Sequence, residues 1–293
     1  MFEVVDISDW KLIHPIPALG YMEKLWLKHP ETNIAWLMKY SSDPDQPVSD
    51  NNFPSDAINE KLASEIAKLF SIPAHQVELA VDDEGQWGVI CKNFLKPEEK
   101  LSHGGQYLST KLGVLQSSPD FKEVTRAYTL QFILETLPHI EEDLIIQLFL
   151  MNLIGNIDMH DKNWALLRYE NKLAPAYDMG ISFVETTFKG EGWFQQIGWE
   201  EGPTSNNFNL WEKLSQNFRT ILQPYMEKLK SEQIVESFSH VLSKVPEEFR
   251  VVMKHQEEFL QKRREKMIKI WEVNDGKDSL LEDVFSDSNA FGG

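Results

Sequence analysis

The fold is decided by the stretch GNIDMHDKN, residues 155–163, which directly follows the segment LIIQLFLMNLI at 144–154. The preceding segment is apolar almost all round, which is typical of a helix buried in a sizeable core. Gly155 is expected to end that helix, and six polar residues then fall within eight positions: Asn156, Asp158, His160, Asp161, Lys162 and Asn163. Polar groups at the end of a buried helix must be satisfied. Together they indicate a functional site, although a capped polar turn explains any one of them.

Two residues of this group have the spacing of a phosphoryl-transfer site. In the catalytic loop H-R-D-x-x-x-x-N of protein kinases, the aspartate accepts the proton of the substrate hydroxyl, and the asparagine five residues later binds Mg²⁺. Asp158 and Asn163 are also five residues apart (163 − 158 = 5). The spacing predicts Asp158 as a catalytic aspartate and Asn163 as a magnesium ligand.

A second magnesium carboxylate is expected one hairpin after this loop. Residues 164–174 read as a strand, a turn and a returning strand. The sequence AYDMG at 176–180 follows, and its Asp178 and Gly180 match the first and third positions of the kinase D-F-G motif. Asp178 is therefore predicted as the second magnesium ligand.

The N-terminal part of the chain should supply a lysine for the nucleotide phosphates and a glutamate that holds this lysine. Lys39 ends the predicted strand 34–38, and the predicted helix 56–70 carries Glu60. The helix has an apolar stripe made of Ile58, Leu62 and Ile66. Glu60 is expected on a different face of the helix, where a solvent-exposed carboxylate is an equally good explanation for it alone. A Lys39–Glu60 pair is the sharper prediction.

The pattern along the chain indicates an α+β, two-lobed protein-kinase-like fold. A small β-rich N-lobe at 1–95 includes a hairpin predicted at 77–81 and 87–91. A larger helical C-lobe follows at 96–273, with helices expected near 121–133, 207–230, 231–243 and 246–272. The acidic tail 274–293 lacks periodicity and is expected to be mobile.

Composition argues against several other classes of protein. The net charge of −17, from 46 acidic and 29 basic residues, opposes direct binding to nucleic acid or to anionic membranes. The densest basic run, 262–266, lies in a predicted helix, where a solvated face explains it. Cys91 is the one cysteine, which suits a reducing cytosol, and the N-terminus has no signal-peptide pattern. We expect a cytoplasmic protein. Export by a route that needs no signal peptide is left open.

Beyond these spacings, the sequence resembles a known family. The run LIGNIDMHDKNWALL at 153–167, followed by LAPAYDMG at 173–180, resembles the C-terminal lobe signature of the HipA-like bacterial serine/threonine kinases. The runs GYMEKLWLKHPET at 20–32 and AWLMKY at 35–40 resemble the nucleotide-binding loop and the lysine strand of shorter members that lack an extra N-terminal subdomain. CKNFLKPEEKLSHG at 91–104 resembles their hinge.

The resemblance implies transfer of the ATP γ-phosphate to a serine or threonine hydroxyl of a protein, with Mg²⁺ as the metal. It implies that Asp158 is the catalytic aspartate, that Asn163 and Asp178 hold Mg²⁺, and that His160 organises the loop. The residues it implies around the nucleotide are Gly20, Lys24, Lys39, Glu60, Lys92, Asn93 and Phe94.

The resemblance also implies a toxin role, paired with a DNA-binding antitoxin. One departure concerns regulation, because the family's nucleotide loop often contains a serine that is autophosphorylated to silence the kinase. Between Pro15 and Thr32 this chain has no serine or threonine, so regulation through that serine is not expected. Residues 183–202, which include Thr186 and Thr187, read equally well as a substrate-docking segment or as an ordered loop.

Three other functions remain open from the sequence. The order Asp-x-His-x-x-Asn at 158–163 is also like that of phosphatidylinositol kinases, although the acidic surface opposes docking on anionic lipid. The adjacent His160 and Asp161 suggest a metal-dependent phosphohydrolase, but the other histidines lack metal-ligand spacing. A non-catalytic kinase fold is the third, and the joint presence of Lys39, Asp158 and Asp178 argues against it.

Overall fold

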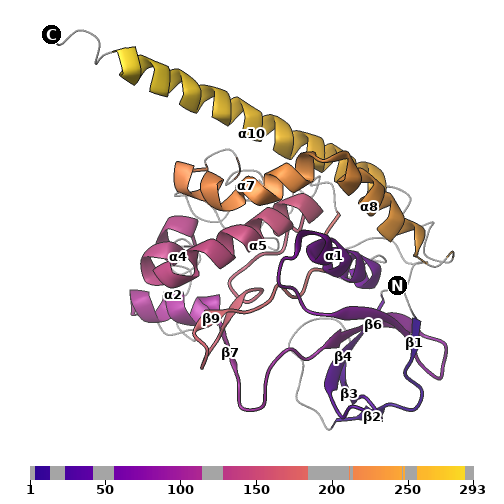
Figure 1. Cartoon of the computed structure of the whole chain (residues 1–293). Coiled ribbons are helices and arrows are strands. Elements are labelled where there is room, and N and C mark those ends of the chain that lie inside the picture. The colour runs from indigo at the N-terminus through magenta and orange to yellow at the C-terminus, as the bar shows by residue number, and fades with distance from the viewer. Residues whose placement is uncertain are drawn as a thin grey trace, which may run out of the picture.

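The computed structural model describes residues 4–13, 24–41, 56–113, 128–183, 211, 214–245, 247 and 256–287, with the side chains of the last helix described to residue 273 (Figure 1). Strands and one long helix occupy the first third of the chain, and helices dominate the rest. Among the described helices, none combines the length and the apolar composition that crossing a membrane requires.

A six-stranded mixed sheet forms the N-terminal part. Its strands are β1 (Val4–Asp6), β2 (Lys11–Leu12), β3 (Lys24–Lys28), β4 (Ala35–Tyr40), β5 (Val77–Val81) and β6 (Trp87–Lys92), in the order β1-β5-β6-β4-β3-β2. β1 runs parallel to β5, and the other neighbours are antiparallel. The hairpin predicted at 77–81 and 87–91 is confirmed, with Gly85 in its turn at a φ of +78° that glycine adopts without strain. Lys39 lies inside β4 rather than at the end of a strand.

Helix α1 (Asp56–Phe70) packs against β5 and β6 and confirms the helix predicted for 56–70. The prediction of a single apolar stripe was too narrow, because every residue from 57 to 64 is buried. Helix α8 (Glu232–Ser243) also packs against α1. Polar side chains of α1 are tolerated inside because they find partners there: Lys61 Nζ donates to the carbonyl of Val77 at 2.7 Å.

The remaining elements are β7 (Leu101–His103), α2 (Gly104–Leu112), α4 (Leu130–Thr136), the 3₁₀ helix η1 (Pro138–Ile140), α5 (Glu141–Ile154), β8 (Ala165–Leu167), β9 (Lys172–Leu173), α7 (Gln216–Lys230), α8 (Glu232–Ser243) and α10 (Gln256–Asp287). β7, β8 and β9 form an antiparallel sheet, and β8 and β9 are the hairpin predicted for 164–174. Helix α5 lies centrally, with α7 and α10 packed against it (Figure 1).

Helix α5 is the buried helix that the apolar run predicts. Its residues from 147 to 154 are all buried. It ends at Gly155, whose φ of +62° is the left-handed conformation that closes many helices. A side chain at this position would also collide with a neighbour, because a Cβ would lie 2.4 Å from the ring of Phe259 on α10. Two independent constraints therefore require glycine where the candidate site begins.

Several helix boundaries differ from those predicted. The helix at 231–243 is confirmed by α8, whereas α7 begins only at Gln216, after the side chain of Ser215 caps it. Helix α10 continues to Asp287, so a boundary near 272 was wrong and most of the tail predicted as mobile is helical. The helix predicted for 121–133 overlaps α4, which begins after the Thr129 cap. The first half of the predicted helix lies outside the described residues.

Phe149 on α5 joins three helices through aromatic contacts. Its ring centroid lies 5.2 Å from that of Phe70, 5.8 Å from Trp211 and 5.5 Å from Tyr225. Because the ring is fully buried, Phe149→Ala should lower the free energy of unfolding by about 3–5 kcal/mol, measured by urea denaturation. Tyr169→Ala, at a side chain that is 67% exposed, is the control and should change it by less than about 0.5 kcal/mol. A loss below about 1 kcal/mol for Phe149→Ala would contradict this account of the core.

Candidate active site

An ion pair between Lys39 and Glu60 lies where the sheet meets α1. Nζ of Lys39 contacts Oε1 of Glu60 at 2.7 Å and Oε2 at 2.8 Å. The two side chains are 11% and 3% exposed, so water screens this pair little. Burial is the largest single effect and opposes the charge on Glu60, but the Lys39 ammonium and the neighbouring His75 together outweigh it and lower the pKa of this carboxyl. The structure thus brings the predicted pair together, and an exposed Glu60 is ruled out.

Asp178 reaches the same ammonium group from the C-terminal part of the chain. Its Oδ1 lies 2.8 Å from Nζ of Lys39, and its side chain remains 41% exposed. The Lys39 ammonium holds the pKa of Asp178 well below its usual range. The backbone φ of Asp178 is +55°, a left-handed conformation that costs a non-glycine residue on the order of 1 kcal/mol. Such a conformation persists only where the surroundings impose it.

Contacts from α1 and from the candidate catalytic loop hold the segment that carries Asp178. Nδ2 of Asn59 on α1 donates to the carbonyls of Gly180 at 3.3 Å and Ser182 at 2.9 Å. The backbone N–H of Ile157 donates to the carbonyl of Ile181 at 3.2 Å. The glutamate helix, the catalytic loop and the Asp178 segment are therefore fixed relative to one another.

The predicted catalytic pair is joined by hydrogen bonds. Nδ2 of Asn163 donates to the carbonyl of Asp158 at 2.6 Å and to its Oδ2 at 3.0 Å. Burial raises the pKa of Asp158 to about 7, and the nearby Asp178 carboxylate acts in the same direction, while the Asn163 hydrogen bond opposes it. A carboxyl group that titrates near neutrality has a suitable acid strength for a general base.

His160 lies in the same loop and contacts Asp158 only loosely, with Nε2 3.7 Å from Oδ1. Its Nδ1 accepts a hydrogen bond from the backbone N–H of Lys162 at 3.1 Å. This contact suits a residue that organises the loop. Among the described residues, the group of three potential metal ligands that the structure brings together lies elsewhere and includes neither His160 nor Asp161.

Two tyrosines that the sequence reasoning missed anchor the loop. The hydroxyl of Tyr128 donates to the carbonyl of Met159 at 2.9 Å and accepts from Nε1 of Trp164 at 2.8 Å. The hydroxyl of Tyr177 donates to the carbonyl of Lys162 at 3.0 Å. Tyr177 is the neighbour of a predicted ligand, which was a usable signal. Tyr128 stands 31 positions from Met159, and no spacing rule connects them.

Of the residues predicted for the nucleotide loop, the structure describes Lys24. It lies on β3 directly opposite Lys39 in the antiparallel ladder. Its positive charge contributes to lowering the pKa of Asp178, after the larger effect of Lys39. Gly20 lies outside the described residues, as do residues 184–202 of the segment considered for substrate docking.

The chain leaves β6 toward the C-terminal part through Lys92, Asn93 and Phe94. The backbone N–H of Asn93 donates to the carbonyl of Ala35 at 3.0 Å, which continues the pairing of β6 with β4. The ring of Phe94 lies 6.2 Å from that of Tyr177, next to Asp178. This connection therefore runs close to the charged residues, in the position of a hinge.

The donor set suits a magnesium ion and nucleotide phosphates. Asn163 and Asp178 offer amide and carboxylate oxygens, which are the ligands that Mg²⁺ prefers. The partial exposure of Asp178 leaves carboxylate surface available for an ion. Lys39 supplies a positive charge of the kind that pairs with phosphate oxygens.

A small sheet with one helix, whose glutamate holds a lysine, is joined to a helical part that carries two acidic loops. This arrangement defines a two-lobed kinase-like fold. The sequence matches the HipA-like C-terminal domain over residues 17–249, and the chain belongs to that family. The family and the fold predicted from the sequence are thereby confirmed. A comparison with curated protein sequences found no match.

Two solved structures show the same fold. The Helicobacter pylori proinflammatory kinase CtkA superposes with a TM-score of 0.69 and 15% identity, over 92% of this chain and 97% of that chain. The HipA protein of a Shewanella oneidensis MR-1 toxin–antitoxin system, solved with HipB and its operator DNA, gives a TM-score of 0.58 and 16% identity, over 89% of this chain and 67% of that chain. The family and both neighbours make this chain a HipA-like kinase at the level of the family.

The raised pKa of Asp158 predicts how stability depends on pH in the metal-free protein. Because the folded-state pKa of about 7 exceeds the ordinary value of 3.8, the native state holds a proton that the unfolded state has released. The free energy of unfolding should therefore fall as pH rises from about 4 through 7. Asp158→Asn removes this loss, so the variant should gain on the order of 3 kcal/mol relative to wild type between pH 4 and pH 8.

Urea denaturation at a series of pH values, with magnesium removed by chelation, measures this difference. Asp83→Asn, at an exposed residue of the β5–β6 turn, is the matched control and should follow the wild-type curve. Parallel curves for Asp158→Asn and wild type would contradict the raised pKa.

Proposed function

We propose that this chain is an ATP- and Mg²⁺-dependent serine/threonine protein kinase that transfers the γ-phosphoryl group of ATP to a protein hydroxyl. The observation that carries the proposal is the bridging of Lys39 between Glu60 at 2.7 Å and Asp178 at 2.8 Å. Protein kinases need a lysine–glutamate pair and a metal-binding aspartate in place together before they are active. Here both contacts share one ammonium group.

In this proposal each acidic or amide group has a distinct role. Asn163 and Asp178 would hold Mg²⁺, and Lys39 would contact the α- and β-phosphates. When bound, Mg²⁺–ATP supplies the transferable phosphoryl group and the neutralisation of its charge. Asp158 orients the hydroxyl of the substrate and accepts its proton on a carboxylate oxygen, which the raised pKa of Asp158 supports.

The chain contributes positioning and electrostatics rather than a covalent intermediate. Asp158 is held by Asn163, and the loop around it is held by Tyr128 and Tyr177 at distances of 2.9–3.0 Å. Such anchoring keeps a proton acceptor in place before the substrate arrives, which is how enzymes reduce the entropy lost on reaching the transition state. His160 is proposed to act through this loop as a positioning residue.

The adenine is proposed to lie against the connection at 92–94. The support is local order, because the backbone N–H of Leu95 donates to Oδ1 of Asn93 at 3.0 Å and fixes the turn that leaves β6. Phe94 supplies an aromatic face near Tyr177. Gly20 and Lys24 are proposed to approach the phosphates from the other side.

A protein substrate and a protein partner are proposed from the relatives. The Shewanella HipA was solved with HipB and operator DNA, which supports a DNA-binding antitoxin as partner and a toxin role for this chain. The net charge of −17 argues that the partner, rather than this chain, contacts the DNA. A cytoplasmic site of action fits such a pair.

Two substitutions separate the proposed roles of the aspartates. Asp178→Asn should weaken the binding of Mg²⁺–ATP at least about 10-fold, because one metal ligand loses its charge. Asp158→Asn should leave binding within about 2-fold of wild type and lower turnover at least about 100-fold, because the proton acceptor is lost. Calorimetry measures binding, and transfer of label from ATP to protein measures turnover.

The outcome of these measurements also tests the alternatives. Equal turnover in wild type and Asp158→Asn would overturn the mechanism, and normal binding by both variants would overturn the metal role of Asp178. Label that moves to phosphoinositide vesicles instead of protein would favour a lipid kinase.

The importance of the Lys39–Glu60 pair is tested on α1 itself. Glu60→Gln should lower kcat/KM about 100-fold, because a neutral side chain no longer holds the ammonium group in place. Glu65→Gln is matched in chemistry and lies on the same helix, where Glu65 contacts Lys61 and Lys68. It should retain activity within about 3-fold of wild type, because the buried Lys61 keeps its contacts with Glu78 at 2.6 Å and with the carbonyl of Val77 at 2.7 Å. Equal losses in the two variants would show that any charge change on α1 suffices.

A further inference from the structure

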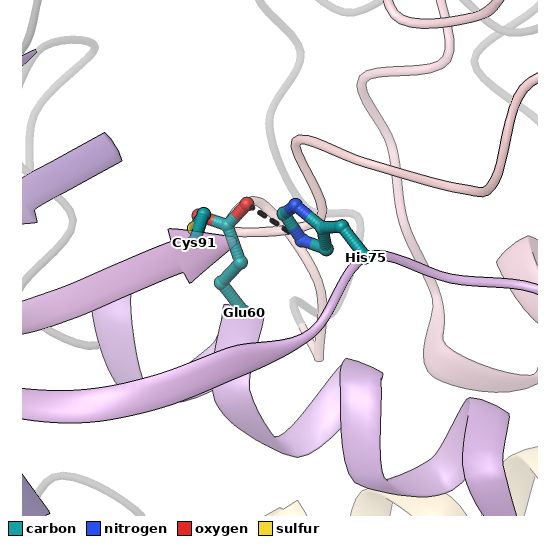
Figure 2. A group of neighbouring side chains, drawn as sticks. All are labelled: Glu60, His75 and Cys91. Atoms are coloured by element: carbon teal, nitrogen blue, oxygen red, sulfur yellow. Dashed lines mark ion pairs between the residues drawn. The ribbon is translucent and has the colours of Figure 1, made fainter. Parts of the chain in front are cut away.

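A second cluster of ligand-type side chains lies directly behind the lysine–glutamate pair. It consists of Glu60 on α1, His75 in the segment before β5, and Cys91 on β6 (Figure 2). One donor atom of each residue lies within 4.8 Å of the others. All three residues are at most 4% exposed. Figure 2 shows the imidazole of His75 and the carboxylate of Glu60 directed toward each other, with Cys91 beside them.

The imidazole of His75 is the observation that points to a ligand. Its Nε2 is buried and forms an ion-pair contact of 3.2 Å with Oε1 of Glu60, although the angles of this contact are not those of a good hydrogen bond. The backbone of His75 is held on both sides, since its N–H donates to Ala176 and its carbonyl accepts from Oγ of Ser64. A buried imidazole nitrogen this close to a carboxylate and a thiol is placed so that one metal ion can bind all three groups.

The three donors have the chemistry of a zinc site. Zn²⁺ binds thiolate, imidazole and carboxylate groups at about 2.0–2.3 Å in tetrahedral geometry, which sets its ligands roughly 3.3–3.8 Å apart. Donors within 4.8 Å of one another need to move by only about an ångström to reach that spacing. Magnesium prefers six oxygen ligands and would not select a site with sulfur and nitrogen. The cluster therefore differs in preference from the proposed magnesium site.

We propose that Glu60, His75 and Cys91 form an inhibitory site for Zn²⁺, which takes the Glu60 carboxylate away from Lys39 and so switches off the active site. On binding, the Cys91 thiol gives its proton to solvent and the sulfur binds the ion, with no change of oxidation state. Water would complete the coordination in the open fourth position. The inhibitory half of this inference rests on the proposed kinase function, and the binding half does not.

Competition follows from which oxygen is shared. Oε1 of Glu60 is both the atom nearest His75, at 3.2 Å, and the atom 2.7 Å from Nζ of Lys39. A doubly charged ion bound there would repel the neighbouring ammonium group. Lys39 would keep its contact with Asp178 at 2.8 Å, which leaves that aspartate paired with the lysine as well. The lysine–glutamate pair would then no longer be in its active arrangement.

Spectroscopy with Co²⁺ tests the binding half directly on the full, metal-free chain. Because Cys91 is the one cysteine in the sequence, a thiolate-to-cobalt charge-transfer band can come from no other residue. We expect one Co²⁺ per chain, with this band and the visible bands of tetrahedral cobalt, and displacement of both by Zn²⁺. Cys91→Ala should abolish the charge-transfer band, and His75→Ala should weaken binding at least 10-fold. The exposed His139→Ala is the control and should bind as wild type does.

Wild-type protein alone can overturn the proposal, so the result does not depend on whether the variants fold. Cobalt that binds without a charge-transfer band, or no stoichiometric binding at all, would overturn it. In assays with excess Mg²⁺–ATP, Zn²⁺ should inhibit wild type at least 10-fold and spare Cys91→Ala. Binding without this difference would overturn the inhibitory role. If the cobalt band appears but neither wild type nor any variant transfers phosphate, the kinase proposal fails and the metal site stands.

Discussion

One buried ammonium group, Nζ of Lys39, holds together parts of the chain that lie 21 and 139 positions away in sequence. Its two partners are Glu60 on α1 and Asp178 after β9. Their negative charges compensate for the hydration that the lysine loses on burial. An isolated charge at this depth would be strongly unfavourable, so the position of α1 on the sheet and the strained backbone of Asp178 both depend on this contact. The same contact makes α1 the natural place for regulation, because any ligand that removes Glu60 from Lys39 acts on the whole site.

The second constraint is the end of α5. Gly155 ends a helix whose residues 147–154 are all buried, and the loop that follows carries partly buried polar groups that need partners. The loop does so by pairing Asp158 with Asn163 and by accepting hydrogen bonds from Tyr128 and Tyr177. The stability of the core and the geometry of the candidate site therefore depend on the same helix, because α5 fills the core and also positions the loop.

Much of the fold followed from local pattern, and the errors have physical causes. The hairpins, both ends of α1 and α8, and the C-terminal end of α5 were predictable because turn residues, caps and glycines act over a few positions. The single apolar stripe predicted for α1 was too narrow because polar side chains also find buried partners. Lys61 pairs across 16 positions with the carbonyl of Val77, which periodicity does not record. The boundary predicted near 272 was also wrong, since α10 runs to Asp287 through a segment with little apolar periodicity.

The sequence by itself determined the residues of the candidate site that lie close together along the chain. Asp158, Asn163 and Asp178 fall within 21 residues, so their spacing alone carried the prediction. Predicting the Lys39–Glu60 pair required more than the sequence pattern. It also required knowing that a kinase site needs a lysine for the phosphates and a glutamate that holds this lysine. Only the tertiary structure decided that His75 and Cys91 stand behind Glu60, because the packing of α1 against β5 and β6 brings them there. Contacts across a packed interface depend on how whole elements fit, and no local spacing records that fit.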